Sequence, residues 1–268
     1  SRGKVMIELM VRRFLYYPSR IPREAPLPPY CADAQEVWFE TSRGDSIHGL
    51  YWPPAHDEPT ILFFHGNAQT VFEWALIREE LEAVRAGMLL IDYPGYGKST
   101  GKPSEEALYA AGLSAWGFLQ REGTAPGEIV IFGKSLGGGV ATEVARDKRG
   151  PGRQPKALVL ESTFTSIPSV ARVLLPLIPT DALFSRERYE SISKLEAIHC
   201  PVMVIHGTED RLIPADEGRA LFEGASPPKE LFLVEGAGHN NVAMVARKEY
   251  GRRLAQWLDS LPPCPAPE

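Results

Sequence analysis

The 268 residues of the chain suit one large α/β domain with an insertion better than two independent domains. Hydrophobic residues make up 44% and charged residues 24%, and the net charge of −5 argues against a nucleic-acid partner, since phosphate binding needs a basic surface. No stretch approaches the roughly 20 apolar residues of a membrane-spanning helix. The cysteines Cys31, Cys200 and Cys264 lack metal-ligand spacing, so the sequence predicts reduced thiols and no metal site.

The N-terminal stretch, residues 5–17, is apolar over most of its length but is interrupted by Glu8, Arg12 and Arg13. Two interpretations stay open, a short helix packed on the domain or a peripheral contact with a membrane. The protein is therefore expected to be cytoplasmic or membrane-associated. Because the chain begins at Ser1 rather than at Met, an upstream signal or anchor stays open as well.

Prolines divide the chain into three parts. Residues 18–29 are proline-rich and cannot sustain a helix or a central strand, so residues 1–35 are predicted to be an N-terminal segment and connector. The folded domain is expected over residues 36–260. A proline-rich tail, residues 261–268, follows it.

Strand and helix patterns alternate along most of the domain. Residues 36–41 and 47–52 are predicted to be antiparallel strands, because Ser42-Arg43-Gly44-Asp45 between them is a hairpin signal. Apolar strands are then expected at 60–64, 88–91, 129–132, 157–160, 202–205 and 231–234. Helices are expected at about 71–85, 104–121, 136–146, 215–222 and 244–258. This pattern predicts the α/β class, with a mostly parallel sheet covered by helices on both faces.

The alternation breaks after Glu161, and residues 162–200 form an insertion between the sixth and seventh strands. The insertion follows the carboxyl end of a strand, where open α/β sheets bind ligands. Its apolar residues are interpreted either as completing the core or as lining an acyl pocket. The residues assigned to that pocket are Val170, Val173, Leu174 and Leu177.

A nucleophile is predicted at Ser135. The strand at 129–132 leads into Gly133-Lys134-Ser135-Leu136-Gly137, and a helical pattern follows. A Gly-x-Ser-x-Gly sequence in this context is typical of a nucleophile elbow, in which a strained turn exposes the serine hydroxyl above the sheet. Gly133 and Gly137 are needed where a β-carbon would collide with the strand or the helix.

A serine hydroxyl needs a base to remove its proton and a third group to orient that base. Asp210 follows the strand at 202–205 and His239 follows the strand at 231–234. Parallel strands bring both loops to the sheet edge that carries Ser135, so the predicted triad is Ser135, Asp210 and His239. The oxyanion donors are predicted to be the N–H groups of Leu136, directly after the nucleophile, and Asn67, directly after Gly66.

Other residues compete for these roles. Glu161 and Asp92 also end strands, and of the two Glu161 is the better substitute for Asp210, while Asp92 suits a turn cap. Lys134 is expected to pack or to face solvent.

The remaining histidines carry no triad pattern. His65 and His206 are expected to be hydrogen-bonded structural residues, and His48, His56 and His199 to serve packing or to lie on the surface.

Six motifs together resemble the α/β-hydrolase superfamily of serine hydrolases, and within it the small, often membrane-tethered subgroup that includes acyl-protein thioesterases (depalmitoylases). They are His65-Gly66-Asn67-Ala68, residues 92–99, 133–138, 161–166, 206–210 and 236–240, in that order. The resemblance spans about residues 36–258. It implies hydrolysis of an ester or thioester of a small or lipid-like acyl substrate through an acyl-enzyme.

This mechanism needs no cofactor. Two alternatives stay open, a peptidase or amidase that uses the same triad, and a protein of the same fold that binds a ligand without turnover.

Overall fold

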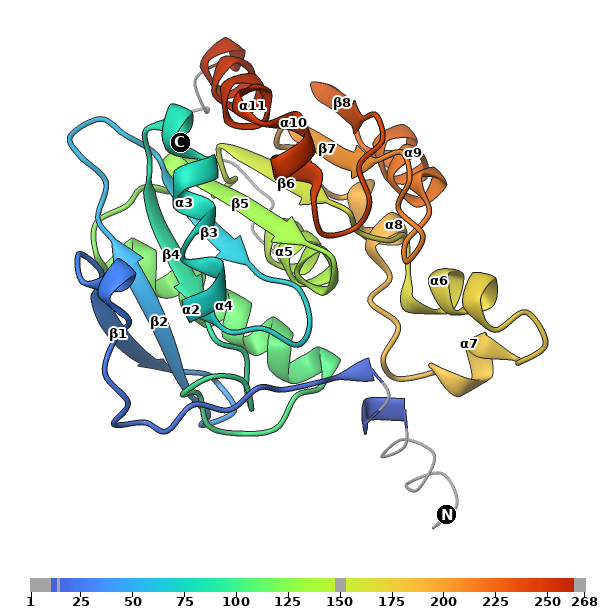
Figure 1. Ribbon diagram of the computed structural model, residues 1–268, viewed down its shortest axis with the longest axis horizontal. Coiled ribbons are helices and arrows are strands. Elements are labelled where there is room, and N and C mark those ends of the chain that lie inside the picture. The colour runs from blue at the N-terminus through green and yellow to red at the C-terminus, as the bar shows by residue number, and fades with distance from the viewer. Residues whose placement is uncertain (1–10, 14, 148–152, 263–268) are drawn as a thin grey trace.

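A central eight-stranded sheet organises the protein, and the computed structural model describes residues 11–13, 15–147 and 153–262 around it. The strands lie in the order β1-β2-β4-β3-β5-β6-β7-β8 (Figure 1). Strand β2 is antiparallel to β1 and β4, and the remaining neighbours are parallel. The strands are β1 (Gln35–Glu40), β2 (Ser46–Trp52), β3 (Thr60–Phe64), β4 (Gly87–Ile91), β5 (Ile129–Lys134), β6 (Ala157–Glu161), β7 (Val202–Gly207) and β8 (Lys229–Val234).

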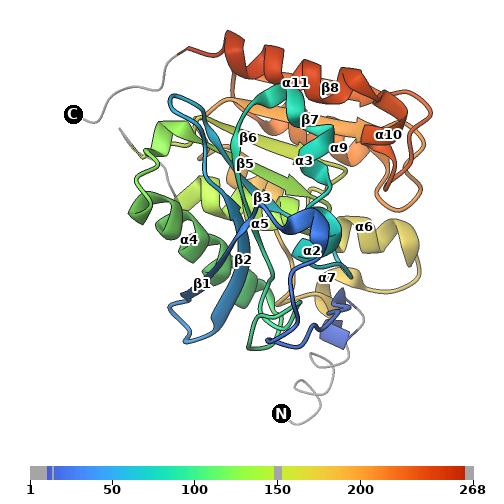
Figure 2. The ribbon, with the colours of Figure 1, turned by 60° about the vertical axis from the view of Figure 1, so that its left-hand side comes forward.

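Helices cover both faces of this sheet. Helices α4 and α5 pack on one face of the sheet, and α3 and α11 pack on the other, as the two sides of the sheet in Figure 2 show. The α-helices are α2 (Val71–Trp74), α3 (Ile77–Glu80), α4 (Glu105–Arg121), α5 (Leu136–Asp147), α6 (Ile167–Leu174), α7 (Thr180–Leu183), α8 (Ser191–Leu195), α9 (Ala215–Gly224), α10 (Val242–Ala246) and α11 (Lys248–Ser260). Short 3₁₀ turns are η1 (Pro29–Cys31), η2 (Glu82–Val84) and η3 (Pro126–Glu128).

Alternating side chains of the strands build two hydrophobic clusters. On β3, Leu62 and Phe64 pack into the cluster on the side of α4 and α5, whereas Ile61 and Phe63 pack into the cluster on the side of α3 and α11. Strands buried on both faces must be apolar, as residues 61–64 of β3 and 88–91 of β4 are. The predicted α/β class and the insertion between β6 and β7 are confirmed.

The helix predicted at 71–85 is wrong as a single element, because the chain forms α2, α3 and η2 there. On one continuous helix, the buried Val71 and Ala75 would point roughly 120° away from the buried Ile77 and Leu81. The break lets both sets face the core. The last helix is divided in the same way, because Arg247 takes a φ of 53° between α10 and α11.

Helices α6, α7 and α8 belong to the insertion, here called the cap (residues 162–200), and α6 and α7 project beyond the end of β6 in Figure 1. The start of the described chain lies beside them. Residues 11–13 and 15 are helical, and Val11 and Tyr16 are buried against the domain. Membrane contact through residues 5–17 stays a prediction, because residues 5–10 and 14 lie outside the described part. Within the described ranges, no helix is both long and apolar enough to cross a bilayer.

Candidate active site

The turn between β5 and α5 holds Ser135 in a left-handed backbone conformation, with a φ of 51°. A β-carbon at Gly137 would collide with the carbonyl oxygen of Phe64, and one at Gly133 would lie 2.5 Å from the β-carbon of Ala141. Only glycine therefore allows α5 to approach the sheet this closely. The backbone N–H of Ser135 donates to the carbonyl of Glu161 at 2.9 Å, which fixes the strained turn to β6.

Ser135, His239 and Asp210 form one hydrogen-bonded chain. His239 Nε2 lies 3.0 Å from Ser135 Oγ, and His239 Nδ1 lies 2.8 Å from Asp210 Oδ2. Asp210 follows β7 and His239 follows β8, so neighbouring parallel strands deliver both to the edge that carries the serine. The structure brings together the residues that the sequence assigned to a triad, within the distances that proton transfer requires.

Asp210 is buried and receives several hydrogen bonds. Its Oδ1 accepts the backbone N–H groups of Leu212 at 2.9 Å and Ile213 at 2.8 Å, and His206 Nε2 lies 3.4 Å from its Oδ2. Burial by itself raises the pKa of Asp210, but the hydrogen bonds from His206, His239 and Ile213 outweigh it and hold that pKa well below its usual range. The carboxylate therefore stays ionised and can orient the Nδ1–H of His239.

The two predicted oxyanion donors lie beside the serine. Leu136 is the first residue of α5, so its N–H has no acceptor one turn earlier in the helix. Asn67 and Leu136 line the same cavity as Ser135, and a β-carbon at Gly66 would lie 3.5 Å from the β-carbon of Ser135. The loop after β3 thus lies against the nucleophile, where a second N–H is required.

The competing carboxylates have other partners. Glu161 accepts hydrogen bonds from Lys134 Nζ and from the hydroxyl of Tyr250. Asp92 accepts the N–H of Lys98 at 3.3 Å, as a cap of the turn that follows it would. It also accepts the N–H of Val71 at the start of α2 and lies 2.6 Å from His48. Of the two alternatives for Lys134, the structure supports packing over a solvent-facing position, because its side chain is only 6% exposed and pairs with Glu161 beneath the elbow.

The other histidines do not touch the nucleophile. His65 is buried with Nδ1 2.6 Å from the carbonyl of Gly66, and burial lowers its pKa. His206 Nε2 lies 2.9 Å from the carbonyl of Ile213. His48 is fully buried, whereas His56 and His199 are exposed.

An apolar cavity of about 350 Å³ opens onto Ser135. Its walls come from the N-terminal segment, the elbow, the cap and the loop after β7. The lining residues are Leu15, Tyr17, Asn67, Ser135, Leu136, Phe164, Ile167, Val170, Ala171, Leu174, Leu175, Phe184, Leu212 and Ile213. Such a cavity can hold an apolar chain with its reacting carbonyl at the serine.

Comparison with known proteins places this geometry in a family. A sequence model described as alpha/beta hydrolase fold matches residues 59–182. The human alpha/beta hydrolase domain-containing protein 17B is 36% identical over 230 residues, which cover 84% of this chain and 76% of that protein. The chain belongs to the α/β-hydrolase family. An uncharacterized protein of Mycobacterium tuberculosis is also similar to this hydrolase, with 35% identity over 235 residues, covering 86% of this chain and 80% of that protein.

A solved structure shows the same fold. An esterase from Pyrococcus furiosus superposes on this hydrolase with a TM-score of 0.72, covering 91% of this chain and 97% of that one. The two share 18% sequence identity, so this likeness shows the fold alone. The expected α/β-hydrolase fold is confirmed.

For two of the four cap residues that the sequence assigned to the acyl pocket of this hydrolase, the assignment is wrong. Val170 and Leu174 line the cavity, but Val173 and Leu177 do not and are 58% and 97% exposed. On α6 the lining side chains centre on one face, and Val173 points roughly 120° away from it. Leu177 lies in the turn after α6, beyond the helix whose periodicity directs side chains inward.

Sequence reasoning also missed lining residues of the hydrolase. Phe164 and Ile167 directly follow β6, and their place beyond the carboxyl end of a strand was a usable signal. Leu15 and Tyr17 carried no such signal, because their contact with the cavity joins segments that are far apart in the chain.

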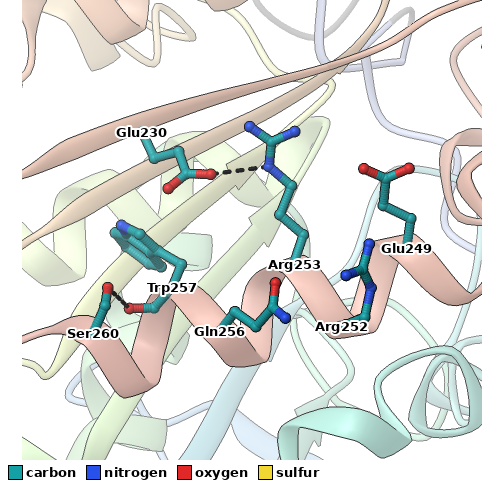
Figure 3. A pocket seen from close by; sticks show the side chains of 7 residues that line it. All are labelled: Glu230, Glu249, Arg252, Arg253, Gln256, Trp257 and Ser260. Atoms are coloured by element: carbon teal, nitrogen blue, oxygen red, sulfur yellow. Dashed lines mark hydrogen bonds and ion pairs between the residues drawn. The ribbon is translucent and has the colours of Figure 1, made fainter.

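A second hollow of about 350 Å³ lies between β8 and α11, and Figure 3 shows its charged and polar lining. Glu230 and Arg253 face each other across it and form an ion pair at 2.9 Å. Glu230 lies near the start of β8, whereas His239 follows its end. This hollow is therefore separate from the site of the hydrolase.

Proposed function

We propose that the protein is a serine hydrolase that cleaves carboxylic ester or thioester bonds of acyl substrates through an acyl-enzyme intermediate. The observation that carries this proposal is the hydrogen-bonded chain Ser135–His239–Asp210, which opens onto an apolar cavity. The triad supports acyl transfer, and the cavity supports an apolar acyl group.

In the first step, Ser135 Oγ attacks the acyl carbonyl while His239 Nε2 takes the serine proton. Asp210 holds the proton-bearing Nδ1 of His239 in place and stabilises the imidazolium that forms. The N–H groups of Leu136 and Asn67 stabilise the negative charge on the carbonyl oxygen. His239 then gives its proton to the leaving alcohol or thiol, which departs and leaves the acyl group on Ser135.

In the second step, His239 removes a proton from water, and the water oxygen attacks the acyl-enzyme carbonyl. The bond to Ser135 Oγ breaks, the serine regains its proton from His239, and a carboxylic acid leaves. No group from outside the protein is required besides water.

The character of the cavity favours an acyl chain over a peptide. Its side walls are aliphatic and aromatic, with Phe164, Ile167 and Phe184 among them, and they present few partners for the amide groups of a peptide backbone. We therefore propose lipid-like esters and thioesters as the substrate class.

A panel of p-nitrophenyl esters and acyl thioesters of increasing chain length tests the proposal, with Ser135→Ala as the blank. Wild-type protein is expected to hydrolyse them, and Ser135→Ala to lose about 10³-fold or more of kcat while keeping its melting temperature. An active-site fluorophosphonate should label wild-type protein and leave Ser135→Ala unlabelled. Undiminished turnover by Ser135→Ala would remove the basis for the proposal.

A further inference from the structure

The carboxamide of Asn67 uses both of its ends to hold the N-terminal segment (described residues 11–13 and 15–17). Its Oδ1 accepts the backbone N–H of Tyr17 at 3.1 Å and the hydroxyl of Tyr96 at 2.6 Å. Its Nδ2 donates to the carbonyl of Leu15 at 2.6 Å. The side chain of a proposed oxyanion donor is therefore fixed by two other parts of the chain.

The same N-terminal segment is also attached to the cap. The hydroxyl of Tyr16 donates to Glu187 Oε2 at 2.5 Å, and Arg12 Nε donates to Glu187 Oε1 at 2.6 Å. Glu187 is almost completely buried. Burial, together with the neighbouring Tyr189 and Glu187, raises the pKa of Tyr16, so its hydroxyl stays protonated and remains a donor.

Side chains on either side of Tyr16 face the substrate cavity. Leu15 and Tyr17 line it together with Ser135, while Tyr16 between them is buried toward the cap. The segment thus spans the space between the hydrolase core and the cap, and its apolar side chains close one side of the cavity.

We propose that residues 15–17 are a working part of the acyl site: Leu15 and Tyr17 limit the length of the acyl chain, and their backbone bonds to the Asn67 side chain hold the Asn67 N–H toward the oxyanion. This inference rests on the proposed acyl transfer at Ser135. It assigns Tyr96 as a positioning residue, since its hydroxyl acts on Asn67 and does not line the cavity.

The physical reason is preorganisation. An oxyanion donor lowers the barrier only if it is already aimed at the developing charge, because reorienting it during the reaction would cost what it gains. Gly66 leaves the peptide before Asn67 without side-chain restraint. Two hydrogen bonds donated to the Asn67 carboxamide, by Tyr17 and Tyr96, and one that it donates to the carbonyl of Leu15 supply that restraint.

The positioning role is tested with Tyr96→Phe, which removes one hydroxyl and keeps the ring. For p-nitrophenyl butyrate we expect kcat to fall between about three- and tenfold, the value of one lost hydrogen bond, with KM nearly unchanged. Tyr51→Phe is the matched control, because Tyr51 is a buried tyrosine on β2, away from the cavity, and its kcat should equal wild type. A lower melting temperature with unchanged kcat in Tyr96→Phe would overturn the positioning role.

The proposed role of Leu15 in limiting the length of the acyl chain, as a wall of the cavity, is tested with Leu15→Trp and Leu15→Ala on the ester panel. Leu15→Trp is expected to shift the preferred acyl chain to shorter lengths, and Leu15→Ala to longer ones. An identical length profile in wild type and both variants would overturn the wall. Failure of the proposed function looks different, because wild-type protein would then show no Ser135-dependent hydrolysis on any ester.

Discussion

The catalytic edge of the sheet and the cap are held in place by different means. The triad residues follow directly from β5, β7 and β8, so hydrogen bonds between parallel strands set their separation. The cap instead depends on side chains that reach it from elsewhere. Glu105 on α4 accepts the N–H groups of Arg188 at 2.6 Å and Tyr189 at 3.0 Å.

Glu217 on α9 fastens the other end of the cap. Its carboxylate accepts the N–H of Thr165 at 2.7 Å and the hydroxyl of Ser169 at 2.5 Å. The cap is therefore held by long-range side-chain contacts, these carboxylates and apolar residues such as Phe184 and Leu195 that join the core, whereas the triad rests on the sheet itself. This difference implies that bond breaking and substrate choice can be altered separately, and the predictions below test that separation.

The largest effect is expected at the sheet edge, with Asp210→Asn. The amide keeps the shape of the carboxylate, but it no longer fixes the catalytic tautomer of His239 or stabilises its imidazolium. We expect kcat for short and long esters to fall equally, by about 10³- to 10⁴-fold. Initial rates across the ester panel measure this, and a loss confined to long esters would contradict the separation.

Glu161→Gln should damage stability instead of catalysis. Glu161 is buried with Lys134 and Tyr250, and removing one partner of a buried ion pair costs roughly 3–5 kcal/mol because the other charge is left unpaired. Its bond to Ser135 comes from the backbone and survives the substitution. Urea unfolding should therefore show a large loss of stability, while kcat at 25 °C stays within a few-fold of wild type.

The double variant Lys134→Met with Glu161→Gln is the control for this effect, because it also removes the positive charge of Lys134 that Glu161→Gln alone leaves unpaired. It should regain part of the lost stability. If Glu161→Gln alone lowered kcat as far as Asp210→Asn does, Glu161 would be needed for catalysis as much as Asp210, and its assignment to stability alone would be wrong.

The triad at the edge of the sheet was predictable from sequence because the patterns that indicate its residues are local. The strand before Ser135, the glycines around it and the loops that carry Asp210 and His239 each follow from short stretches with a fixed geometry. The breaks between α2, α3 and η2 were missed, although the rotation of the apolar face within residues 71–85 was readable there.

The cavity was only partly predictable because its walls depend on long-range contacts. Val170 and Leu174 could be selected for their apolar character, but apolar character alone did not separate them from Val173 and Leu177. The contact between Leu15 and Asn67 joins residues 52 positions apart, and no local pattern encodes it.

Acid should lower the free energy of unfolding of the protein through Asp210. Its folded-state pKa is depressed, so the unfolded chain takes up a proton first as the pH falls, and stability present above the unfolded pKa of about 3.9 is lost below it. Between pH 7 and pH 3, wild type is expected to lose about 1 kcal/mol more of its free energy of unfolding than Asp210→Asn does. Urea titrations at the two pH values measure the difference, and parallel losses in both proteins would contradict it.

The smallest effect is expected on the cap, where Leu174→Ala and Leu177→Ala form a matched pair. Leu174 lines the cavity and Leu177 is 97% exposed, so only the first removes apolar surface from a bound chain. Leu174→Ala should raise KM for long-chain esters roughly threefold and leave acetate unaffected, because about one methylene's worth of burial is lost. Leu177→Ala should match wild type on both. Equal increases in KM for the two variants would mean that the acyl chain also contacts the outer surface of the cap. The binding surface would then extend beyond the face of α6 that lines the cavity.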